Sequence, residues 1–484
     1  MLKRLSLTTT VSVIVFYCTL YADNNKALGD LYKSANAIET IKGDYVFKDQ
    51  IDLRGGSYTF PDCERIIFID GAFVRNGKVY LNPNTYEIVG PIGIFEHSEL
   101  SPTSLKGNNK VSLRELNVRW FGCYGQGDKD ETLALEYALN SAHNLSIPLK
   151  IPRGTYYTSK ALDLKEGDIL MGEFAGQVGA NNQQGQTIIR NTSSTGDILT
   201  VSGNHVEIRN IMLVCSKDYV VNGIHIKGGG LGFNMRNVFI GNTHYAVYAV
   251  LENGKGFSEC KWEDVVIRNA VRGISIDMNK DKGQYLTFNS FYNTRFLNIK
   301  EYGVYFHSQT INTQTFRDCL FANVGYGQAY DKSFVSSPVY ALFIDNDGHQ
   351  GSVYVDGGYF ENVFFSKDGR SARTDDANTA VLYLKNINCT VSNARFANTR
   401  TIVDSQGNDY VRLVNCIDNG YIEGSLPKAF LCRKGKNAVI DVNGYSFSNR
   451  DKGFIRGIDD IKSDPKASIS RIQLSNHRYV DAIE

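Results

Sequence analysis

The sequence predicts an all-β fold, a single-stranded right-handed parallel β-helix in which the chain winds into a solenoid of stacked coils. Three observations predict it: a strand-rich composition, a recurring six-residue segment, and an asparagine that closes each copy of that segment. The 484 residues include 45 Gly, 28 Tyr and 26 Phe but 9 Pro and 5 Met, which favours many short strands joined by tight turns. A chain this long in one fold indicates a repeat.

The six-residue segment can be aligned with itself seven times. The copies are residues 237–242, 264–269, 293–298, 318–323, 357–362, 393–398 and 414–419. The fourth position is always Ile or Phe, as expected of a strand position that points inward and is buried between coils. The inward residues are therefore expected to be Ile240, Ile267, Phe296, Phe321, Phe360, Phe396 and Ile417.

The asparagine that closes each segment has a physical reason. Asparagine tolerates the left-handed backbone conformation of a sharp bend, and its amide can bond to the same residue of the next coil, about 4.8 Å away. The expected ladder consists of Asn242, Asn269, Asn298, Asn323, Asn362, Asn398 and Asn419.

A second strand follows the bend in most coils. It covers residues 223–226, 273–276, 303–306 and 341–344, where apolar residues alternate with variable ones. Because side chains alternate along a strand, His225, Ser275, Tyr305 and Phe343 are expected to point outward. The residue that follows each of three such strands is Asp277, His307 and Asp345, and we expect these three to form one outward column.

The sequence also predicts the domain organisation and a helix that caps the β-helix. The domain organisation is read as a signal peptide at 1–22, a leading β-rich segment at 23–118, the β-helix at 119–425 and C-terminal strands with a cap at 426–484. A capping helix is expected from Asp130 to Leu145, with Asp130 at its N-terminus. Its apolar face is expected to carry Leu133, Ala134, Tyr137, Ala138 and Ala142.

The first residues are typical of an export signal. Lys3 and Arg4 precede an apolar run at 11–16, and cleavage is expected after Ala22. This predicts a secreted or periplasmic protein without membrane insertion, because no later apolar run of about 18 residues follows. The bulky residues before Cys18 argue against lipid anchoring there.

Charge and cysteine content narrow the class of partner. The 52 basic and 51 acidic residues give a net charge of +1, so no global attraction to nucleic acid or anionic lipid is expected. The 9 cysteines lack the close spacing of metal knuckles, and their spacing does not determine any disulfide pairing. The sequence does not determine the oligomeric state either.

One stretch resembles a known family. Residues 120–176 match, in order, the opening phrase of the pectate-lyase-like superfamily, which includes rhamnogalacturonase and epimerase-like domains and some phage tailspikes. The matching residues are Phe121-Gly122, Gly125, Gly127-Asp128, Asp130-Glu131-Thr132, Ile151-Pro152, Gly154-Thr155-Tyr156 and Leu170-Met171-Gly172. The resemblance implies the β-helix fold, but that superfamily hosts lyases, hydrolases, epimerases and non-catalytic tails. The Asn-Thr-Asp, Gly-His-Gly and Arg-Ile-Lys motifs of polygalacturonases are missing, which argues against that type of hydrolase.

Two mechanisms of polysaccharide cleavage fit the outward residues. In β-elimination at a uronic acid, His307 would be the base, Tyr305 the proton donor, and Arg295 or Arg268 the group that neutralises the sugar carboxylate. In glycoside hydrolysis, two carboxylates would act as acid and as base or nucleophile, either Asp277 with Asp345 or Asp345 with Glu361. The sequence does not rank the two.

Further residues are expected to hold substrate or a metal. Tyr305, His225, His349 and Arg268 are candidate substrate-binding residues, and the widest insertions, after Asn323 and after Asn362, are candidate binding loops. Asp345 and Asp347 could bind Ca²⁺ through their oxygens, although no calcium-loop pattern is present.

The leading hypothesis is thus a secreted carbohydrate-active enzyme that cleaves an acidic or complex polysaccharide. The alternative from another class is a non-catalytic β-helix for glycan binding or adhesion. Convergence of titratable residues in one partly desolvated site would distinguish the enzyme from the binding protein, because only catalysis requires it.

Overall fold

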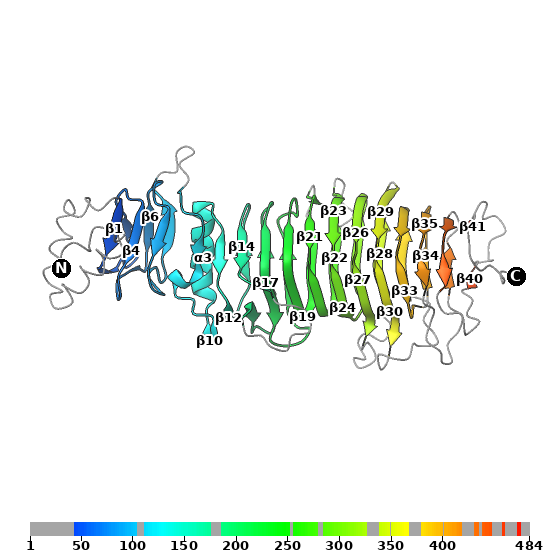
Figure 1. Ribbon diagram of the computed structural model, residues 1–484, viewed down its shortest axis with the longest axis horizontal. Coiled ribbons are helices and arrows are strands. Elements are labelled where there is room, and N and C mark those ends of the chain that lie inside the picture. Colours follow the sequence, from blue (N-terminus) through cyan, green and yellow to red (C-terminus); the bar gives the residue numbers. More distant parts are fainter. Residues whose placement is uncertain are drawn as a thin grey trace, which may run out of the picture. The chain divides into compact units, whose positions relative to one another are not determined.

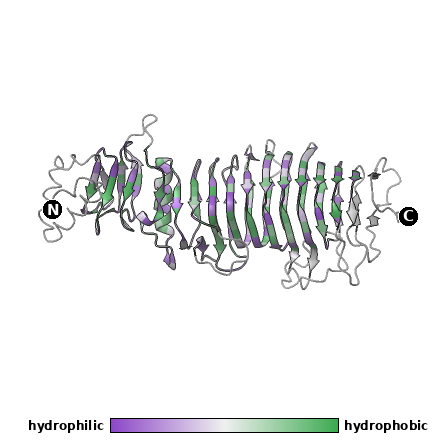
Figure 2. Cartoon of the chain, viewed as in Figure 1, coloured by the Kyte–Doolittle hydropathy of each residue, from purple (hydrophilic) through white to green (hydrophobic). Residues whose placement is uncertain are grey.

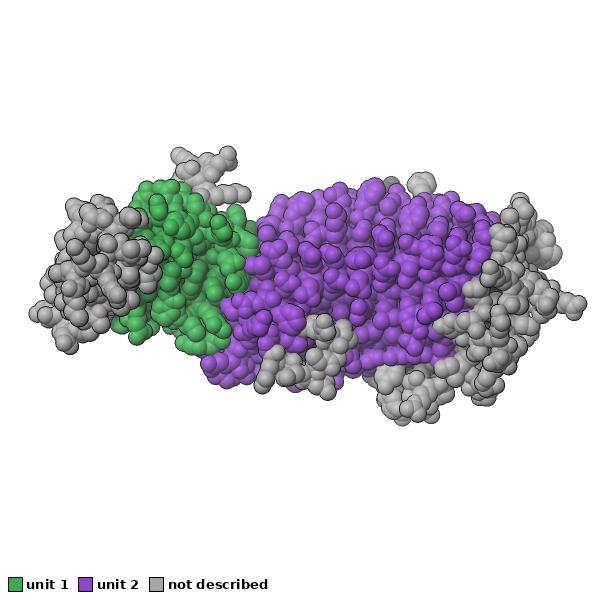
Figure 3. Space-filling view, viewed as in Figure 1, with its two compact units in different colours: residues 1–124, 133–150 green, residues 125–132, 151–484 purple. Residues whose placement is uncertain are grey.

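The computed structural model describes residues 43–103, 111–175, 185–251, 255–278, 284–326, 338–348, 350–366, 379–399, 401–418, 430–434, 438–447, 457–459 and 472–475. The chain divides into two compact units, made of residues 1–124 with 133–150 and of residues 125–132 with 151–484 (Figure 3). The expected signal peptide at 1–22 lies outside the described residues. No helix among the described residues has the length and apolar character needed to cross a membrane.

The first unit contains short strands that pair in parallel. They are β1 (Asp44–Phe47), β2 (Gln50–Asp52), β3 (Ser57–Thr59), β4 (Arg65–Phe68), β5 (Phe73–Arg75), β6 (Lys78–Leu81), β7 (Glu87–Val89) and β8 (Glu99–Pro102). The orders β1-β4-β7, β2-β5 and β3-β6-β8 show that each strand pairs with its counterpart one turn later. The leading segment is therefore itself a short parallel solenoid, around a core that includes Phe47, Phe60, Phe68 and Phe95.

The predicted helix is present as α3 (Thr132–Leu145). The Asp130 carboxylate accepts the backbone N–H of Thr132 at 2.9 Å, as expected of an N-terminal acidic residue. The expected apolar face is confirmed for Ala138 and Ala142, which are buried, and was wrong for Leu133, which is 50% exposed. The buried side chains are Leu135, Ala138, Leu139, Ala142 and Leu145. Within the first unit, Ser141 Oγ accepts the N–H of Leu100 at 2.8 Å, which ties the helix to β8.

Short elements flank this helix. They are β9 (Leu116–Asn117), a 3-10 helix (Val118–Phe121), β10 (Gln126–Asp130), and β11 (Leu149–Ile151), which pairs with β9.

The second unit is a parallel β-helix whose strands lie side by side along the solenoid (Figure 1). We group the strands into three sheets by their pairing. The first sheet contains β14 (Ile169–Gly172), the starts of β17 (Glu207–Cys215) and β19 (Asn234–Leu251), β20 (Phe257–Ser258), β21 (Lys261–Glu263), β23 (Leu286–Tyr292), β26 (Ile311–Arg317), β29 (Gly351–Asp356), β32 (Ile387–Ser392), β35 (Tyr410–Val414), β38 (Val439–Asn443) and β41 (Ile472–Ser475).

The other two sheets follow in each coil. The second sheet contains β12 (Gly154–Thr158), β15 (Thr187–Asn191), the end of β17, the middle of β19, the start of β22 (Val266–Met278), β24 (Arg295–Ile299), β27 (Leu320–Tyr326), β30 (Tyr359–Ser366), β33 (Arg395–Ala397), β36 (Ile417–Asp418) and β39 (Ser446–Phe447). The third sheet contains β13 (Leu162–Leu164), β16 (Asp197–Val201), β18 (Asn222–Ile226), the ends of β19 and β22, β25 (Tyr302–Ser308), β28 (Val339–Asn346), β31 (Thr379–Lys385), β34 (Thr401–Ser405), β37 (Phe430–Lys434) and β40 (Gly457–Asp459).

The asparagine ladder is confirmed over six coils. Each side-chain amide donates to the Oδ1 of the preceding member, at 3.1, 3.0, 3.0, 2.8 and 2.5 Å along Asn242, Asn269, Asn298, Asn323, Asn362 and Asn398. All six have φ between 52° and 60°. Asn419 lies outside the described residues. The first residue of most segments, such as Asn237 and Asn293, has a positive φ as well, so each segment is a short strand between two left-handed bends.

The inward stack is confirmed for the first six segments. Ile240, Ile267, Phe296, Phe321, Phe360 and Phe396 are each 0% exposed. The phenylalanine rings stack face to face, with centroids 4.5 Å, 5.1 Å and 5.5 Å apart along the four coils that carry them. Figure 2 shows both hydrophobic and hydrophilic stretches on the strands, as burial of one strand face requires.

The seventh segment was aligned one residue out of register. Ile417 pairs with Arg395 and is 37% exposed, whereas Asp418 pairs with Phe396 and is fully buried. The left-handed bend at Asn415 marks the true start of this segment. Asp418 tolerates the inward position because its Oδ2 accepts the hydroxyl of Tyr445 at 2.8 Å.

Replacing Asn298 by leucine is expected to cost about 1 to 3 kcal/mol of unfolding free energy, through strain in the left-handed bend and unpaired amides at Asn269 and Asn323. Urea denaturation of both proteins measures the change. Replacement by aspartate, which tolerates the bend but cannot donate to Asn269, should cost less than leucine. An unchanged midpoint for leucine would contradict a stabilising ladder.

Candidate functional site

The site residues lie on the outward face of the third sheet. Asp277 at the end of β22 pairs with His307 of β25, His307 pairs with Asp345 of β28, and Asp345 pairs with Lys385 of β31. The predicted column of Asp277, His307 and Asp345 is therefore present in register. Lys385 extends it by one coil. The sequence analysis missed Lys385, although the alternating run Val381 to Leu384 marks the strand that carries it.

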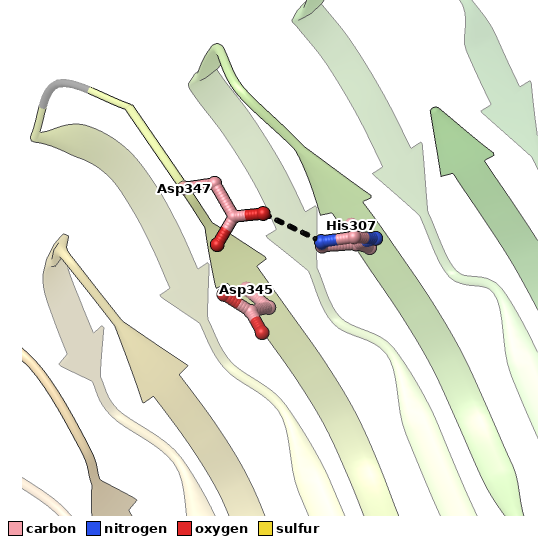
Figure 4. A group of neighbouring side chains, drawn as sticks. All are labelled: His307, Asp345 and Asp347. Carbon is pink, nitrogen blue, oxygen red and sulfur yellow. Dashed lines mark hydrogen bonds and ion pairs between the residues drawn. The ribbon is translucent and has the colours of Figure 1, made fainter. Parts of the chain in front are cut away.

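The side chains of this column form one network with Asp347, which follows β28. His307 Nδ1 lies 2.9 Å from Asp277 Oδ1, and His307 Nε2 lies 2.9 Å from Asp347 Oδ2. Lys385 Nζ lies 2.8 Å from Asp345 Oδ1 and 2.8 Å from Asp347 Oδ1. Figure 4 shows His307 and Asp345 on neighbouring strands, with Asp347 beyond the strand end and turned toward the imidazole. We call these five residues the His307 cluster.

The cluster controls the charge of the imidazole. The hydrogen bond with Asp277, joined by that with Asp347, raises the pKa of His307 from 6.5 to about 9 despite partial burial. Hydrogen bonding to Lys385 and then to His307 lowers the pKa of Asp347. His307 is therefore an imidazolium at neutral pH. It is suited to donate a proton, which argues against the base role considered from the sequence.

Stability is expected to depend on pH through His307. Because its pKa is raised in the folded state, its contribution is fully present below pH 6.5 and is lost as the pH rises from 6.5 through about 9. Urea midpoints of the wild type and of His307→Gln at pH 6, 7.5 and 9.5 measure this contribution. The wild-type advantage should be largest at pH 6 and smallest at pH 9.5. A difference that does not vary with pH would contradict the shift.

An aromatic column runs beside the His307 cluster on the same face. His225, Tyr248, Ser275, Tyr305, Phe343 and Tyr383 pair in successive coils. The rings of Tyr305 and Phe343 stack at 4.8 Å and those of Phe343 and Tyr383 at 4.1 Å, while His225 stacks on Tyr248 at 4.0 Å. The predicted outward position of His225, Tyr305 and Phe343 is therefore confirmed. Ser275 lies in the same register but is only 6% exposed. Burial raises the pKa of Tyr305 to about 12, so its hydroxyl stays protonated.

A charged pair interrupts the aromatic surface in the coil of Ser275. Arg272 Nε donates to Glu301 Oε2 at 2.6 Å, and the guanidinium lies 5.1 Å from the ring centroid of Tyr302 and 5.8 Å from that of Tyr305. Sequence analysis missed this pair, because Arg272 and Glu301 belong to different coils and neither carries a motif.

A second polar group surrounds Asp197 at the start of β16. Its carboxylate lies 3.1 Å from His225 Nδ1 and accepts the Tyr248 hydroxyl at 3.1 Å and the Asn222 amide at 3.0 Å. Burial of Asp197 is outweighed by these bonds, and the pKa of its carboxyl is lowered. His225 is thus held with Nδ1 toward Asp197, which leaves Nε2 for a ligand.

The remaining predicted residues do not join the His307 cluster. Arg268, Arg295 and Glu361 lie in β22, β24 and β30 of the second sheet, where Arg268 pairs with Leu297 and Glu361 with Ala322. They belong to another face of the coil than His307. His349 lies outside the described residues.

Three ligand atoms from His307, Asp345 and Asp347 lie within 4.8 Å of one another. The group fits Ca²⁺ poorly, because Ca²⁺ prefers six to eight oxygen ligands and the Lys385 ammonium already bridges the two carboxylates.

Comparison with known proteins supports the fold. No family model and no curated protein matches the chain. The tailspike gp42 of Acinetobacter phage vb_AbaP_AS12 is similar with a TM-score of 0.50 and 14% identity, over 69% of this chain and 58% of that one. The tailspike gp49 of Acinetobacter baumannii bacteriophage Fri1, a capsular polysaccharide depolymerase, gives 0.46 and 13% over 71% and 64%. The A-module of the Azotobacter vinelandii mannuronan C-5 epimerase AlgE6 gives 0.30 and 13% over 74% and 96%.

These likenesses concern the fold alone. The similarity to the gp42 tailspike, at a TM-score of 0.50, agrees with the parallel β-helix fold of the chain. It spans 58% and 64% of the length of the two tailspikes.

Proposed function

We propose that the protein is an exported carbohydrate-active enzyme that hydrolyses a glycosidic bond on the outward face of the third sheet. The observation that carries the proposal is the His307 cluster, in which a charged imidazole and three carboxylates from neighbouring coils converge beside an aromatic column. Convergence of titratable groups with raised or lowered pKa is typical of catalytic sites, and aromatic side chains are typical of ligand sites.

The roles follow from the charges. His307, protonated at neutral pH, would donate its Nε2 proton to the leaving oxygen of the glycosidic bond, which would take the place of Asp347 at that nitrogen. Asp345 would act as the base that activates water or as the nucleophile, and Asp277 would hold the imidazolium in place. Tyr305 and Phe343 would contact the sugar rings through the aromatic column.

Charge favours hydrolysis over β-elimination. In their charged forms, three aspartates contribute −3 and His307 with Lys385 contribute +2, so the His307 cluster carries a net charge of −1. Lys385 is paired with Asp345 and Asp347, and Arg272 with Glu301. Elimination needs a positive group to neutralise the sugar carboxylate, and among the described residues His307, Lys385 and Arg272 each already pair with a carboxylate.

A second candidate is glycan binding without cleavage. It is favoured by one observation: the charges of His307 and Lys385 are compensated within the cluster, as in a surface network that only stabilises the coils. Under this candidate the aromatic column alone would contact the glycan.

The test is incubation of the purified protein with a panel of neutral and uronate-containing polysaccharides. Hydrolysis produces reducing ends without absorbance near 235 nm, whereas β-elimination produces both. Reducing ends alone support the proposal. Absorbance at 235 nm contradicts hydrolysis, and retention on a glycan column without any product supports binding only.

A further inference from the structure

A left-handed bend recurs in successive coils near the beginning of the first-sheet strands. The bend residues are His205, Gly232, Glu259, Phe288 and Thr313, with φ values of 56°, 66°, 57°, 56° and 50°. They stack through backbone hydrogen bonds, such as Gly232 N to Ser258 O at 2.8 Å and Glu259 N to Thr287 O at 3.1 Å. The bend is therefore a property of the fold that does not depend on one residue type.

Phe288 is the bulky aromatic member of this series. A bulky aromatic residue is strained in the left-handed region of backbone conformation, which a glycine such as Gly232 adopts without steric strain. The Phe288 side chain is 57% exposed, so its ring gains little from burial. Two hydrogen bonds hold Thr313 in its left-handed conformation. Its backbone N–H donates to Ser352 Oγ of the next coil at 3.0 Å, and its hydroxyl donates to Asn312 Oδ1 at 3.2 Å. Strain held at an exposed apolar residue indicates a function.

Phe288 lies one corner of the coil away from the His307 cluster. The strand β23 that carries it begins at Leu286, whose N–H donates at 2.8 Å to the carbonyl of Thr310, three residues after His307. Two further apolar side chains are exposed at the same corner, Val250 at 55% and Tyr285 at 38%. Val250 pairs with Asp277, which places it at the start of the column that contains His307.

The neighbours of Phe288 indicate which ligand it could contact. In the preceding coil the bend residue is the exposed Glu259, and in the following coil it is Thr313. Beside it, the hydroxyls of Thr287 and Ser258 lie 3.0 Å apart. An exposed aromatic ring suits the apolar face of a sugar, while the Glu259 carboxylate of the preceding coil disfavours an anionic one.

We propose that Phe288 is a sugar-binding residue that stacks on an uncharged sugar unit of the same glycan that the His307 cluster cleaves. The inference rests on the proposed function and narrows its substrate class to glycans with an uncharged unit beside the cleavage point.

The test uses Phe288→Gly with Thr313→Gly as its matched control. Both replacements relieve the left-handed bend, but only the first removes a ring. On a glycan that the wild type cleaves, Phe288→Gly is expected to raise KM about fivefold or more with an unchanged or higher Tm. Thr313→Gly should leave KM unchanged, and Phe288→Tyr should retain the wild-type KM.

The possible outcomes separate this inference from the proposed function. A wild type that neither cleaves nor binds any glycan of the panel overturns both. An active wild type with the same KM in Phe288→Gly overturns the role of Phe288 alone. A Phe288→Gly protein that sediments as a smaller species than the wild type also overturns it, because the ring would then lie in a contact between copies.

Discussion

Replacing Phe321 by alanine is expected to lower the free energy of unfolding by about 3 to 5 kcal/mol. The Phe321 ring is fully buried and stacks between Phe296 at 4.5 Å and Phe360 at 5.1 Å. Its removal deletes the contacts with both rings, and the hydrogen-bonded coils on either side cannot close over the gap. Urea denaturation followed by far-UV circular dichroism measures the loss.

A matched control for this change is Tyr354→Ala. Tyr354 is also an aromatic strand residue but points outward from β29 and is 47% exposed, so its loss should change stability by about 0.5 kcal/mol or less. A loss below about 1 kcal/mol for Phe321→Ala would show that the stacked rings contribute little to the fold.

Replacing His307 by alanine is expected to lower kcat about 100-fold or more on a glycan that the wild type cleaves. The imidazolium is the proton donor in the proposed mechanism, and its partners Asp277 and Asp347 cannot replace it. Wild-type activity should also fall as the pH rises through about 9, because a general acid must be protonated. Initial rates of reducing-end formation between pH 5 and 10 measure both effects.

Two further variants complete this experiment. Asp345→Asn removes the carboxylate proposed as base or nucleophile and should lower kcat by a similar factor. His205→Asn removes an exposed imidazole from a left-handed bend that asparagine tolerates, and its activity should equal that of the wild type. Full activity in both His307→Ala and Asp345→Asn would place the catalytic groups elsewhere.

The sequence predicted the parts of the fold that repeat locally. The six-residue segment reveals the coil because the bend and the inward position each accept few residue types, and both recur. The alignment failed at Ile417, where the inward residue is the acidic Asp418 and the apolar pattern no longer reports the register. The solenoid of the first unit was missed, although the turn dipeptides at Gly55-Gly56 and Asn76-Gly77 recur one coil apart.

The candidate site was predicted in part for the same reason. Asp277, His307 and Asp345 occupy one strand position in successive coils, so periodicity brought them together. Arg295 and Glu361 were predicted on a face near the column, and the structure has them in β24 and β30 of the second sheet, apart from the His307 cluster. The raised pKa of His307 comes first from its hydrogen bond with Asp277 and further from that with Asp347, and no spacing in the sequence contains the direction in which the Asp347 side chain turns after β28.

The stacking of coils also fixes the distance along the solenoid between outward residues of different coils. From His225 to His307 the chain advances by three coils, through β18, β19, β22 and β25, which corresponds to about 14 Å at 4.8 Å per coil. Insertion or deletion of one whole coil in this interval would change that separation by about 4.8 Å, close to the length of one sugar unit, while every remaining coil kept a stacking partner. Under the proposed function, the span between two residues that contact a glycan would thus change in steps of about one coil without redesign of either residue.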